Sequence, residues 1–372
     1  MKPSEHALSG RRIAQILATS TGGVGTHIRA ILPGLRATGA SVLVCGPPAT
    51  DQLFGFGLAG AQFTSVRIAS GLRPVEDAHA LLSLRRALRG QEIAHAHGLR
   101  AALLTVLARP KAPIVVTLHN ALLDPPGMRR RISQALERVV LRRADVVLAA
   151  SLDLAEHARS LGARDVRPSP VSAPPLPSAN RNRADTRAEL GVSGTTPLLL
   201  AVGRLHPQKG YDTLLAAARE WRGRSDGLRV VIAGDGPLHA AMAEQIGRED
   251  LPVVLLGRRS DVADLLDASD LVVLTSQWEA RALVAQEALR AGRPLIATAV
   301  GGIPELAGKG AGVLIPPGEP AALDAAVTEV LRHPAKAAAL VVAGKAAAAS
   351  WPTLDDTVDQ LCALYGELLG SP

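Results

Sequence analysis

The carboxylates best placed to act on a phosphate-bearing ligand lie in the second half of the chain. Glu279 and Glu287 stand eight residues apart, on either side of Arg281, where we expect a helix to begin. The first amides of a helix have no partner within it, so those of Ala282–Val284 can bind a diphosphate. The two carboxylates can then hold sugar and ribose hydroxyls. An ordinary amphipathic helix with exposed glutamates is the alternative interpretation.

Two cations follow an apolar run that ends at Gly203. Arg204 and Lys209 follow in the loop after this predicted strand, before a helix. Ligands of open α/β sheets bind at the carboxyl ends of the strands, and both cations suit a diphosphate leaving group. Two solvated surface cations are the alternative.

Two glycine turns could bring backbone amides close to a phosphate. They are STGGVGTHI at Ser20–Ile28 and VIAGDGPL at Val231–Leu238, and each lies between a predicted strand and a predicted helix. The first is not a dinucleotide fingerprint, because Ile28 occupies the third glycine position and Cys45, not an acidic residue, ends the next strand. NAD binding is therefore not expected, and a simple tight turn is the alternative for this segment.

Three histidines stand near strand ends. His119 closes the apolar run Val115–Asn120, so it can face a cleft as a hydrogen-bonding or acid–base group. His95 and His97 share one face of a strand, at i and i+2. No acidic or cysteine partner lies at ligand spacing, so we expect no metal site.

The elements that must position these residues alternate regularly. Continuous apolar runs between helical patterns indicate parallel sheets covered on both faces. Strands are expected at Ile13–Ala18, Ser41–Cys45, Gln62–Ile68, Glu92–His95, Ile114–Leu118, Val146–Ala149, Leu198–Val202, Leu228–Ala233, Val253–Leu255, Leu271–Thr275 and Leu295–Ala297. Helices are expected at Thr26–Thr38, Val75–Leu88, Arg129–Arg143, Gln208–Glu220, Pro237–Gly247, Val262–Ala268, Arg281–Ala291, Ala321–Ala349 and Leu354–Leu369. The pattern predicts an α/β protein with two doubly wound domains and a cleft between them.

A segment rich in Pro, Ser and Asn, Arg167–Arg183, interrupts this alternation and indicates a linker. We expect an N-terminal domain over residues 1–170, a linker over 171–190 and a C-terminal domain over 191–350.

Composition restricts the class of protein. Of 372 residues, 47% are hydrophobic and only two are cysteines, which excludes a disordered chain and a disulfide framework. The first 180 residues hold 22 Lys and Arg against 11 Asp and Glu, and the rest hold 19 against 23. The basic half suits an anionic partner, but the scarcity of aromatics argues against single-stranded nucleic acid. With no secretory signal and no stretch of about 20 apolar residues, we expect a cytoplasmic protein.

One segment suggests contact with a membrane. Met128–Asp145 is amphipathic: apolar side chains lie on one face, and arginines cluster elsewhere over Arg129–Arg143. Basic amphipathic helices can lie on anionic membranes, here the inner face of the plasma membrane. We expect the apolar face, which includes Ile132 and Val139, to pack on the sheet, while the arginines reach solvent or lipid headgroups.

Together the motifs resemble a known family. The order GGVGTHI, a strand-end His, GRLHPQKG, GDGPL, two glutamates eight apart and GGIPEL is similar to glycosyltransferase family 4, which has the GT-B fold. The resemblance covers nearly the whole chain, including the tail after Trp351. It implies that a C-terminal helix within residues 351–370 crosses back to the first domain. It also implies a metal-independent, cofactor-free, retaining transfer of a hexose from a UDP- or GDP-sugar to a hydroxyl acceptor, such as a lipid-linked or cell-envelope glycan precursor.

The resemblance also implies roles for individual residues. Arg204 and Lys209 bind and stabilise the leaving diphosphate, Glu279 holds hydroxyls of the donor sugar, and His119 contacts that sugar from the other domain. Glu287 binds the ribose. The remaining donor-binding positions are Gly22, Gly23, Val24, Gly203, Gly236, Arg258, Leu283 and Val284.

One departure from the family pattern concerns the donor site. The family usually has glycine after the first glutamate, whereas this chain has Ala280, followed by Arg281 as an additional cation beside the diphosphate. Two other functions stay open: a nucleotide-sugar epimerase or hydrolase on the same fold, and a non-catalytic nucleotide-sugar-binding subunit.

Overall fold

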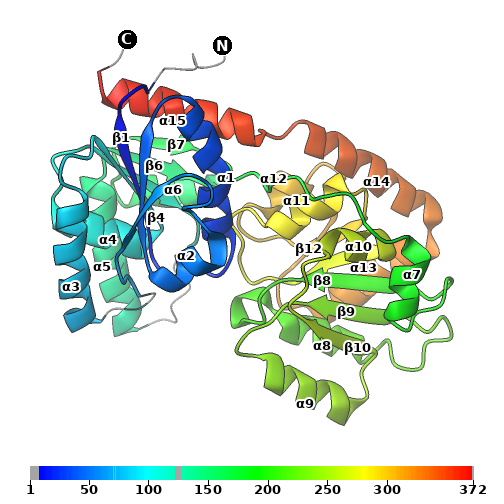
Figure 1. Ribbon diagram of the computed structural model, residues 1–372. Coiled ribbons are helices and arrows are strands. Elements are labelled where there is room, and N and C mark those ends of the chain that lie inside the picture. Colours follow the sequence, from blue (N-terminus) through cyan, green and yellow to red (C-terminus); the bar gives the residue numbers. More distant parts are fainter. Residues whose placement is uncertain (1–7, 70, 72, 122–126, 371–372) are drawn as a thin grey trace. The chain divides into compact units, whose positions relative to one another are not determined.

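The computed structural model describes residues 8–69, 71, 73–121 and 127–370. The chain forms two compact units: unit 1 comprises Met1–Pro174 and Pro352–Pro372, and unit 2 comprises Pro175–Trp351. Each unit is built on a parallel sheet with helices on both faces (Figure 1). The expected pair of parallel α/β domains is confirmed, as is a C-terminal helix that belongs to the first of them.

The described part of unit 1 contains a seven-stranded sheet of order β3-β2-β1-β4-β5-β6-β7. Its strands are β1 (Arg12–Leu17), β2 (Ser41–Gly46), β3 (Gln62–Ser65), β4 (Ile93–His97), β5 (Ile114–Leu118), β6 (Val146–Ala149) and β7 (Val166–Pro168). Its helices are α1 (Gly23–Ala37), α2 (Pro48–Phe54), α3 (Pro74–Ala87), α4 (Leu99–Ala108), α5 (Met128–Arg143), α6 (Leu152–Ser160) and α15 (Leu354–Leu368). Strands β4, β5 and β6 are buried along their whole length, as expected for strands covered on both faces.

Helix α15 is held in unit 1 by local capping and by close packing. Thr353 and Asp356 form a capping box at its start. Leu361 and Tyr365 are buried in the core of unit 1. A Cβ at Gly34 of α1 would lie 2.7 Å from a methyl group of Val358, so glycine there permits close approach of the two helices.

The described part of unit 2 contains a six-stranded parallel sheet of order β10-β9-β8-β11-β12-β13. Its strands are β8 (Leu198–Val202), β9 (Arg229–Ala233), β10 (Val253–Gly257), β11 (Leu271–Leu274), β12 (Leu295–Thr298) and β13 (Val313–Ile315). Its helices are α7 (Arg183–Glu189), the 3-10 helix η1 (Pro207–Lys209), α8 (Tyr211–Ala218), α9 (His239–Glu249), α10 (Val262–Ala268), α11 (Leu283–Arg290), α12 (Ile303–Ala307), α13 (Pro320–Arg332) and α14 (Pro334–Ala349).

Two expected helices are divided in the structure. The helix expected over Gln208–Glu220 is η1 followed by α8, because Gly210 adopts a φ of +60° between them. The alanine-rich stretch forms α13 and α14, which are separated at His333, because the proline that follows cannot continue a helix from α13.

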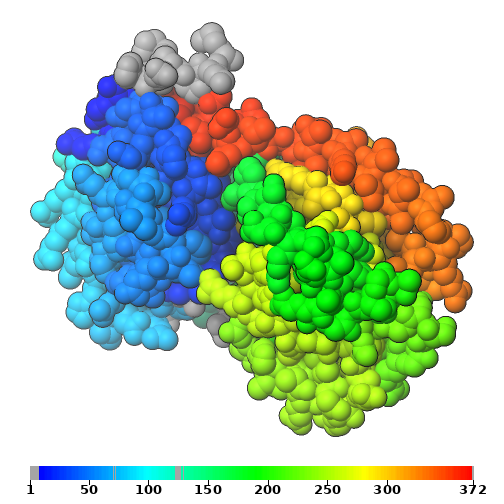
Figure 2. Space-filling view, turned by 45° about the vertical axis from the view of Figure 1, so that its right-hand side comes forward, coloured from blue at the N-terminus to red at the C-terminus, as the bar shows by residue number. Residues whose placement is uncertain are grey.

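The segment predicted as a linker is structured at both ends. Arg167 lies in β7, and Arg183 begins α7. The backbone amides of Asn180 and Arg181 donate to the Asp264 carboxylate at 2.6 and 3.1 Å. The part of this stretch that belongs to unit 2, together with α7, lies on the outside of that unit, where it is green in Figure 2. Composition indicated a linker, and in the structure ion pairs and amide contacts hold its second half in place.

One apolar stretch was missed in the sequence. Pro334–Leu368 is long and apolar enough to span a membrane by length and composition, with a mean hydropathy of 1.2. This is weak evidence for a span, because the stretch is divided between α14 and α15. In addition, α15 places Leu361, Cys362 and Tyr365 in the core of unit 1.

Candidate functional site

The strand order of each sheet reverses once, and several predicted site residues lie beside the reversals. In unit 1 the reversal lies between β1 and β4, and in unit 2 between β8 and β11. Open parallel sheets bind ligands outside the carboxyl ends of strands at such a point. The segment after β1 leads to Gly22, and those after β8 and β11 carry Arg204 and Glu279.

The structure brings two predicted residues of unit 2 into direct contact. The Nζ atom of Lys209 lies 2.5 Å from Oε1 of Glu279. The hydroxyl of Ser276 donates to the same oxygen at 2.7 Å. The side chains of Lys209 and Glu279 are 21% and 10% exposed, so the pair is shielded but still reaches the surface. The result is a fixed carboxylate beside a fixed cation.

The backbone around this pair is positioned by glycines. Gly301 has a φ of +51°, and a Cβ there would lie only 1.9 Å from the carbonyl oxygen of Glu279. The amide of Gly302 donates to that same oxygen at 2.9 Å. At Gly210, next to Lys209, a Cβ would lie 2.1 Å from the carbonyl oxygen of Thr275. The GGIPEL motif therefore fixes the loop that carries Glu279.

Arg204 differs from Lys209 because it has no partner among the described residues. It is exposed, and within the part of the chain that the structure describes it makes no hydrogen bond or ion pair. Partial burial, together with the charge of Arg204, lowers the pKa of His206. Arg204 is thus a cation at the carboxyl end of β8 that is free to meet an anion.

Gly203 and Gly236 also have structural reasons to be glycine. A Cβ at Gly203 would lie 3.1 Å from the Tyr211 hydroxyl and 3.3 Å from Cε of Lys209. Gly236 has a φ of +158°, and a Cβ there would lie 2.5 Å from the carbonyl oxygen of Leu205. The following helix, α9, begins at His239 and not at Pro237 as expected, so Gly236 lies outside its first turn.

Helix α11 begins two residues later than expected, at Leu283. Its N-cap residue, Ala282, provides no side-chain cap, so the amides of Leu283 and Val284 have no partner within the helix. Glu287 lies one turn further along. Burial raises the pKa of Glu287 to about 7, an effect that the charge of Arg290 partly offsets.

Arg281, two residues before α11, stacks on an aromatic ring of the same unit. Its guanidinium carbon lies 5.6 Å from the centre of the Trp351 ring, and that of Arg290 lies 5.8 Å from the same ring. Burial lowers the pKa of Arg281, and its buried Nε has no hydrogen-bond partner. The indole thus stabilises the guanidinium of Arg281 on one side, and a place for this cation beside a diphosphate stays a prediction.

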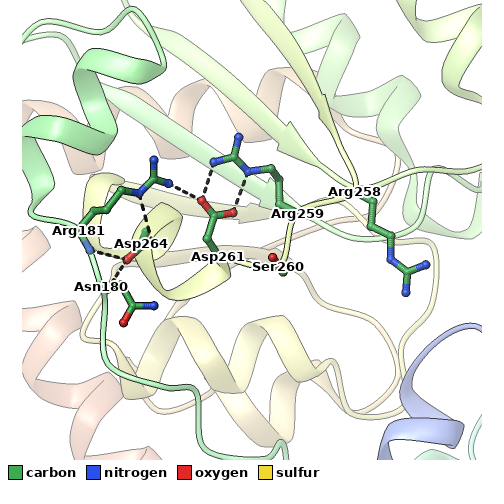
Figure 3. Close-up of a pocket in the computed structure, with 7 residues that line it drawn as sticks. All are labelled: Asn180, Arg181, Arg258, Arg259, Ser260, Asp261 and Asp264. Carbon is green, nitrogen blue, oxygen red and sulfur yellow. Dashed lines mark hydrogen bonds and ion pairs between the residues drawn. The ribbon is translucent and has the colours of Figure 1, made fainter. Parts of the chain in front are cut away.

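Arg258 lines a surface pocket of about 480 Å³ in unit 2. In Figure 3 its side chain extends away from the other cations, whereas Arg181 and Arg259 point to Asp261. Their charges are thus neutralised within the protein. Arg258 is exposed after β10, at the same edge of the sheet as Arg204.

In unit 1 the glycine turn begins α1. Gly22 is the N-cap residue and Gly23 the first helical residue, and both are exposed. A Cβ at Gly22 would meet nothing within 4 Å, whereas one at Gly25 would lie 2.2 Å from the Phe54 ring. Packing therefore requires Gly25 but leaves the backbone at Gly22–Val24 open to a ligand.

His119 lies at the end of β5 in a group of buried histidines. Its ring stacks on His97 with centroids 5.3 Å apart, and His27 of α1 lies edge-on at 5.5 Å. Burial lowers the pKa of His27 to about 4 and that of His119 well below its usual value. Both rings are therefore uncharged at neutral pH, so His119 can exchange hydrogen bonds with a neutral sugar hydroxyl.

Sequence reasoning missed several residues of the site. Ser276, Gly301 and Gly302 lie in the motif that we selected, but nothing in the sequence showed that they hold Glu279. Among the described residues, no group of three or more His, Cys, Asp or Glu side chains is arranged to hold a metal ion.

Family models match both units in sequence order. A model described as a glycosyl transferase 4-like domain matches residues 22–174, and one described as glycosyl transferases group 1 matches residues 182–347. The two parallel α/β units and these two matches define a GT-B protein. The chain belongs to glycosyltransferase family 4.

Relatives with assigned names are glycosyltransferases. D-inositol 3-phosphate glycosyltransferase of Segniliparus rotundus is 33% identical over 195 residues, which are 50% of this chain and 43% of that protein. The enzyme of the same name from Mycobacterium bovis is 30% identical over 306 residues, 75% of this chain and 62% of that protein. Alpha-D-kanosaminyltransferase of Streptomyces kanamyceticus is 28% identical over 306 residues, 77% of this chain and 79% of that protein. The match to the first of these relatives thus spans less than half of its length.

Solved structures share the fold at lower identity. HepE of Anabaena, in complex with UDP, has a TM-score of 0.78 and 22% identity, covering 95% of this chain and 100% of that chain. WaaG, a glycosyltransferase involved in lipopolysaccharide biosynthesis, has a TM-score of 0.76 and 17% identity, covering 95% and 99%. At these identities the likeness shows the fold alone.

Proposed function

We propose that the protein is a retaining glycosyltransferase that moves a hexose from a nucleoside diphosphate sugar to a hydroxyl acceptor. The observation that carries the proposal is the Lys209–Glu279 pair at the strand reversal of unit 2, on the same sheet edge as the exposed Arg204. HepE has been solved with UDP and with UDP-glucose, which favours a UDP-linked donor.

The proposed roles follow from charge and position. Arg204 and Lys209 bind the diphosphate, and the amides of Leu283 and Val284 bind its oxygens at the start of α11. Glu279 accepts hydrogen bonds from the donor sugar, and Glu287 accepts them from the ribose. His119 and the open backbone at Gly22–Val24 serve the donor or acceptor from unit 1, and Arg258 borders the base.

The reaction needs no protein nucleophile. The bond between the anomeric carbon and the β-phosphate oxygen breaks while the acceptor oxygen bonds to the same face of the sugar. The acceptor proton passes to the departing phosphate oxygen, and the nucleoside diphosphate leaves. Arg204 and Lys209 stabilise the charge that develops on the phosphate, which is where preorganised cations lower a barrier most. We propose that the reaction requires neither a metal ion nor a cofactor.

A thermal-shift screen of UDP- and GDP-linked hexoses tests the proposal. A ligand at 100 times its Kd stabilises the folded state by about 2.7 kcal/mol, which should raise the melting temperature by several degrees. We expect one donor to produce this rise in the wild type, and Glu287→Ala to lose it. Glu244→Ala, a change at a mostly exposed glutamate on α9, is the matched control and should retain it.

Two results would contradict the proposal. If no nucleotide sugar and no nucleoside diphosphate shifts the melting temperature, the nucleotide site is absent. Binding without release of nucleoside diphosphate in the presence of candidate acceptors would instead favour a non-catalytic binding subunit.

We also propose that α5 docks on an anionic membrane surface, with the protein on the cytoplasmic side. The expectation that its apolar face packs on the sheet was wrong for Ile132 and Val139, which are 48% and 47% exposed, and for the exposed Ala135. With Met128 they form an exposed apolar stripe at helical spacing, and the exposed Arg138 and Arg142 lie on the same helix. Such a surface suits anionic headgroups and supports an acceptor that is lipid-linked or part of the cell envelope.

Sedimentation with phosphatidylglycerol-containing vesicles tests this docking. We expect binding at low salt that weakens as salt rises, because charge attraction is screened. Removing two half-exposed apolar side chains in Ile132→Ser/Val139→Ser should reduce the bound fraction roughly tenfold. Val342→Ser, at an exposed apolar position on α14, is the control. Equal sedimentation of wild type and double variant, or none at all, would rule out the proposed docking.

A further inference from the structure

Six buried polar side chains of unit 1 form one continuous hydrogen-bonded chain, which we call the polar chain. It runs from β5 through β4 to α15, then through β1 and β4 to the residue after β5. In order, its contacts are Thr117 Oγ1 to His95 Nε2 at 2.6 Å, His95 Nδ1 to Tyr365 Oη at 2.6 Å, Tyr365 Oη to Gln15 Nε2 at 3.0 Å, Gln15 Oε1 to His97 Nε2 at 2.7 Å, and His97 Nδ1 to His119 Nε2 at 3.1 Å.

The polar chain reaches the surface at one end. Gln15, His95 and Tyr365 are completely buried, and His97 is 2% exposed, whereas His119 is 8% exposed. The Nδ1 atom of His119 makes no hydrogen bond within the part of the chain that the structure describes. His119 is therefore the terminal member, with one ring nitrogen available to a ligand.

The three histidines of the polar chain are uncharged. Burial lowers the pKa of His95 to about 3, and lowers that of His97 and His119 well below the usual value. An uncharged imidazole carries a single N–H. When both of its nitrogens are hydrogen-bonded, one must donate and the other must accept. The direction of one bond therefore decides the direction of the next.

The amide of Gln15 connects the two halves of the polar chain. Its Nε2 group donates to Tyr365, so the tyrosine hydroxyl is left to donate to His95 Nδ1. Its Oε1 atom can only accept, so His97 must carry its proton on Nε2. Nδ1 of His97 then accepts, and His119 must carry its own proton on Nε2. This leaves Nδ1 of His119 as an acceptor.

The opposite orientation of the Gln15 amide would reverse every donor. Tyr365 would then donate to Gln15, and His97 would receive a hydrogen bond on Nε2 and donate from Nδ1. The proton of His119 would move to Nδ1, which would become a donor to the ligand. The tautomer of His119 thus depends on residues that do not touch the ligand.

We propose that Gln15, His97 and Tyr365 are positioning residues that fix the tautomer of His119, so that its Nδ1 accepts a hydrogen bond from a hydroxyl of the donor sugar. The contact with the sugar rests on the proposed function, whereas the tautomer is a property of the ligand-free protein. Because Tyr365 belongs to α15, the polar chain also makes the proper docking of this helix a condition for the correct form of His119.

Histidine side-chain ¹⁵N NMR of the ligand-free protein tests the tautomer. His119→Gln assigns the signal by its loss. We expect His119 to carry its proton on Nε2 in the wild type, and to populate both tautomers in Gln15→Leu and in Tyr365→Phe. Tyr365→Phe removes only one hydroxyl and should fold, so the tautomer can be measured in this variant if Gln15→Leu does not fold. Thr105→Ala, which deletes a buried hydroxyl outside the polar chain, should leave the His119 signal unchanged.

Binding measurements give a second readout. UDP and the nucleotide sugar selected by the thermal-shift screen are titrated into the wild type and Tyr365→Phe. One misdirected hydrogen bond should lower the affinity of Tyr365→Phe for the nucleotide sugar about two- to tenfold. UDP, which lacks the donor sugar, should bind to Tyr365→Phe with the same affinity as to the wild type.

The two proposals fail in different ways. A proton on Nδ1 of His119 in the wild type, or an unchanged tautomer in both variants, would overturn the positioning role even if nucleotides bind. Equal weakening of UDP and nucleotide sugar in Tyr365→Phe would also overturn it, because that pattern indicates general damage. Absence of all nucleotide binding in the wild type would contradict the proposed function while leaving the NMR result valid.

Discussion

Arg204→Ala should lower the rate of glycosyl transfer about 10²–10³-fold, the loss typical of one preorganised charge-stabilising group. The melting temperature of the ligand-free protein should stay close to that of the wild type, because Arg204 is exposed and none of its described neighbours depends on it for a hydrogen bond or ion pair. The measurement is release of nucleoside diphosphate from the donor found by screening, with acceptor or with water in its place.

Two further variants separate leaving-group stabilisation from a general effect of charge. Arg248→Ala removes a 64% exposed cation from α9 and should leave the rate unchanged. Lys209→Ala should lower the rate as Arg204→Ala does, but should also lower the melting temperature, because it leaves the Glu279 carboxylate without its cation. A wild-type rate in Arg204→Ala would exclude this residue from the reaction.

Glu287→Gln should change the pH dependence of stability and of nucleotide binding together. The pKa of Glu287 is raised to about 7 in the folded protein, from about 4.5 when exposed. Between these values the folded state holds a proton that the unfolded state has released. The preference of the folded state for protonated Glu287 therefore adds to the free energy of unfolding. This contribution is complete below pH 4.5 and is lost as pH rises through 7. Relative to Glu287→Gln, the free energy of unfolding of the wild type should fall by about 1–3 kcal/mol from pH 5 to pH 8.

Binding should follow the opposite trend. The proposed ribose contact requires the ionised carboxylate, so the affinity of the wild type for nucleoside diphosphate should rise about tenfold from pH 6 to pH 8 through Glu287. Protonation of the nucleotide phosphates changes the affinity equally in the wild type and in Glu287→Gln. The difference between the two proteins therefore reports the ionisation of Glu287. At pH 8 the variant should bind about 10–100-fold more weakly, the range for hydrogen bonds to a charged group.

Calorimetric titration and urea unfolding at both pH values provide these numbers. Identical pH profiles of binding in wild type and Glu287→Gln would place Glu287 outside the nucleotide site. Identical profiles of stability would show that its carboxylate is solvated in the folded protein.

Features that depend on neighbouring residues along the chain were determined by the sequence. Continuous apolar runs such as Ile114–Leu118 can be satisfied only in strands covered on both faces, which predicted two parallel sheets. Loops that follow such strands must end at one edge of the sheet, so the strand-end positions of Arg204, Glu279 and His119 were also predictable. The prediction was weakest at helix ends, where a single glycine such as Gly210 or the turn at His333 divides a helix.

The packed faces and the distant partners were decided only by the tertiary structure. Amphipathic spacing located the apolar face of α5, but the fold buries Val140 and leaves Ile132 and Val139 exposed. Arg281 stacks on Trp351, which lies 70 residues further along the chain. Tyr365 meets Gln15 across 350 residues. Spacing along the chain carries no information about such contacts, because they exist only after α15 has packed on unit 1 and the buried groups have had to find partners away from water.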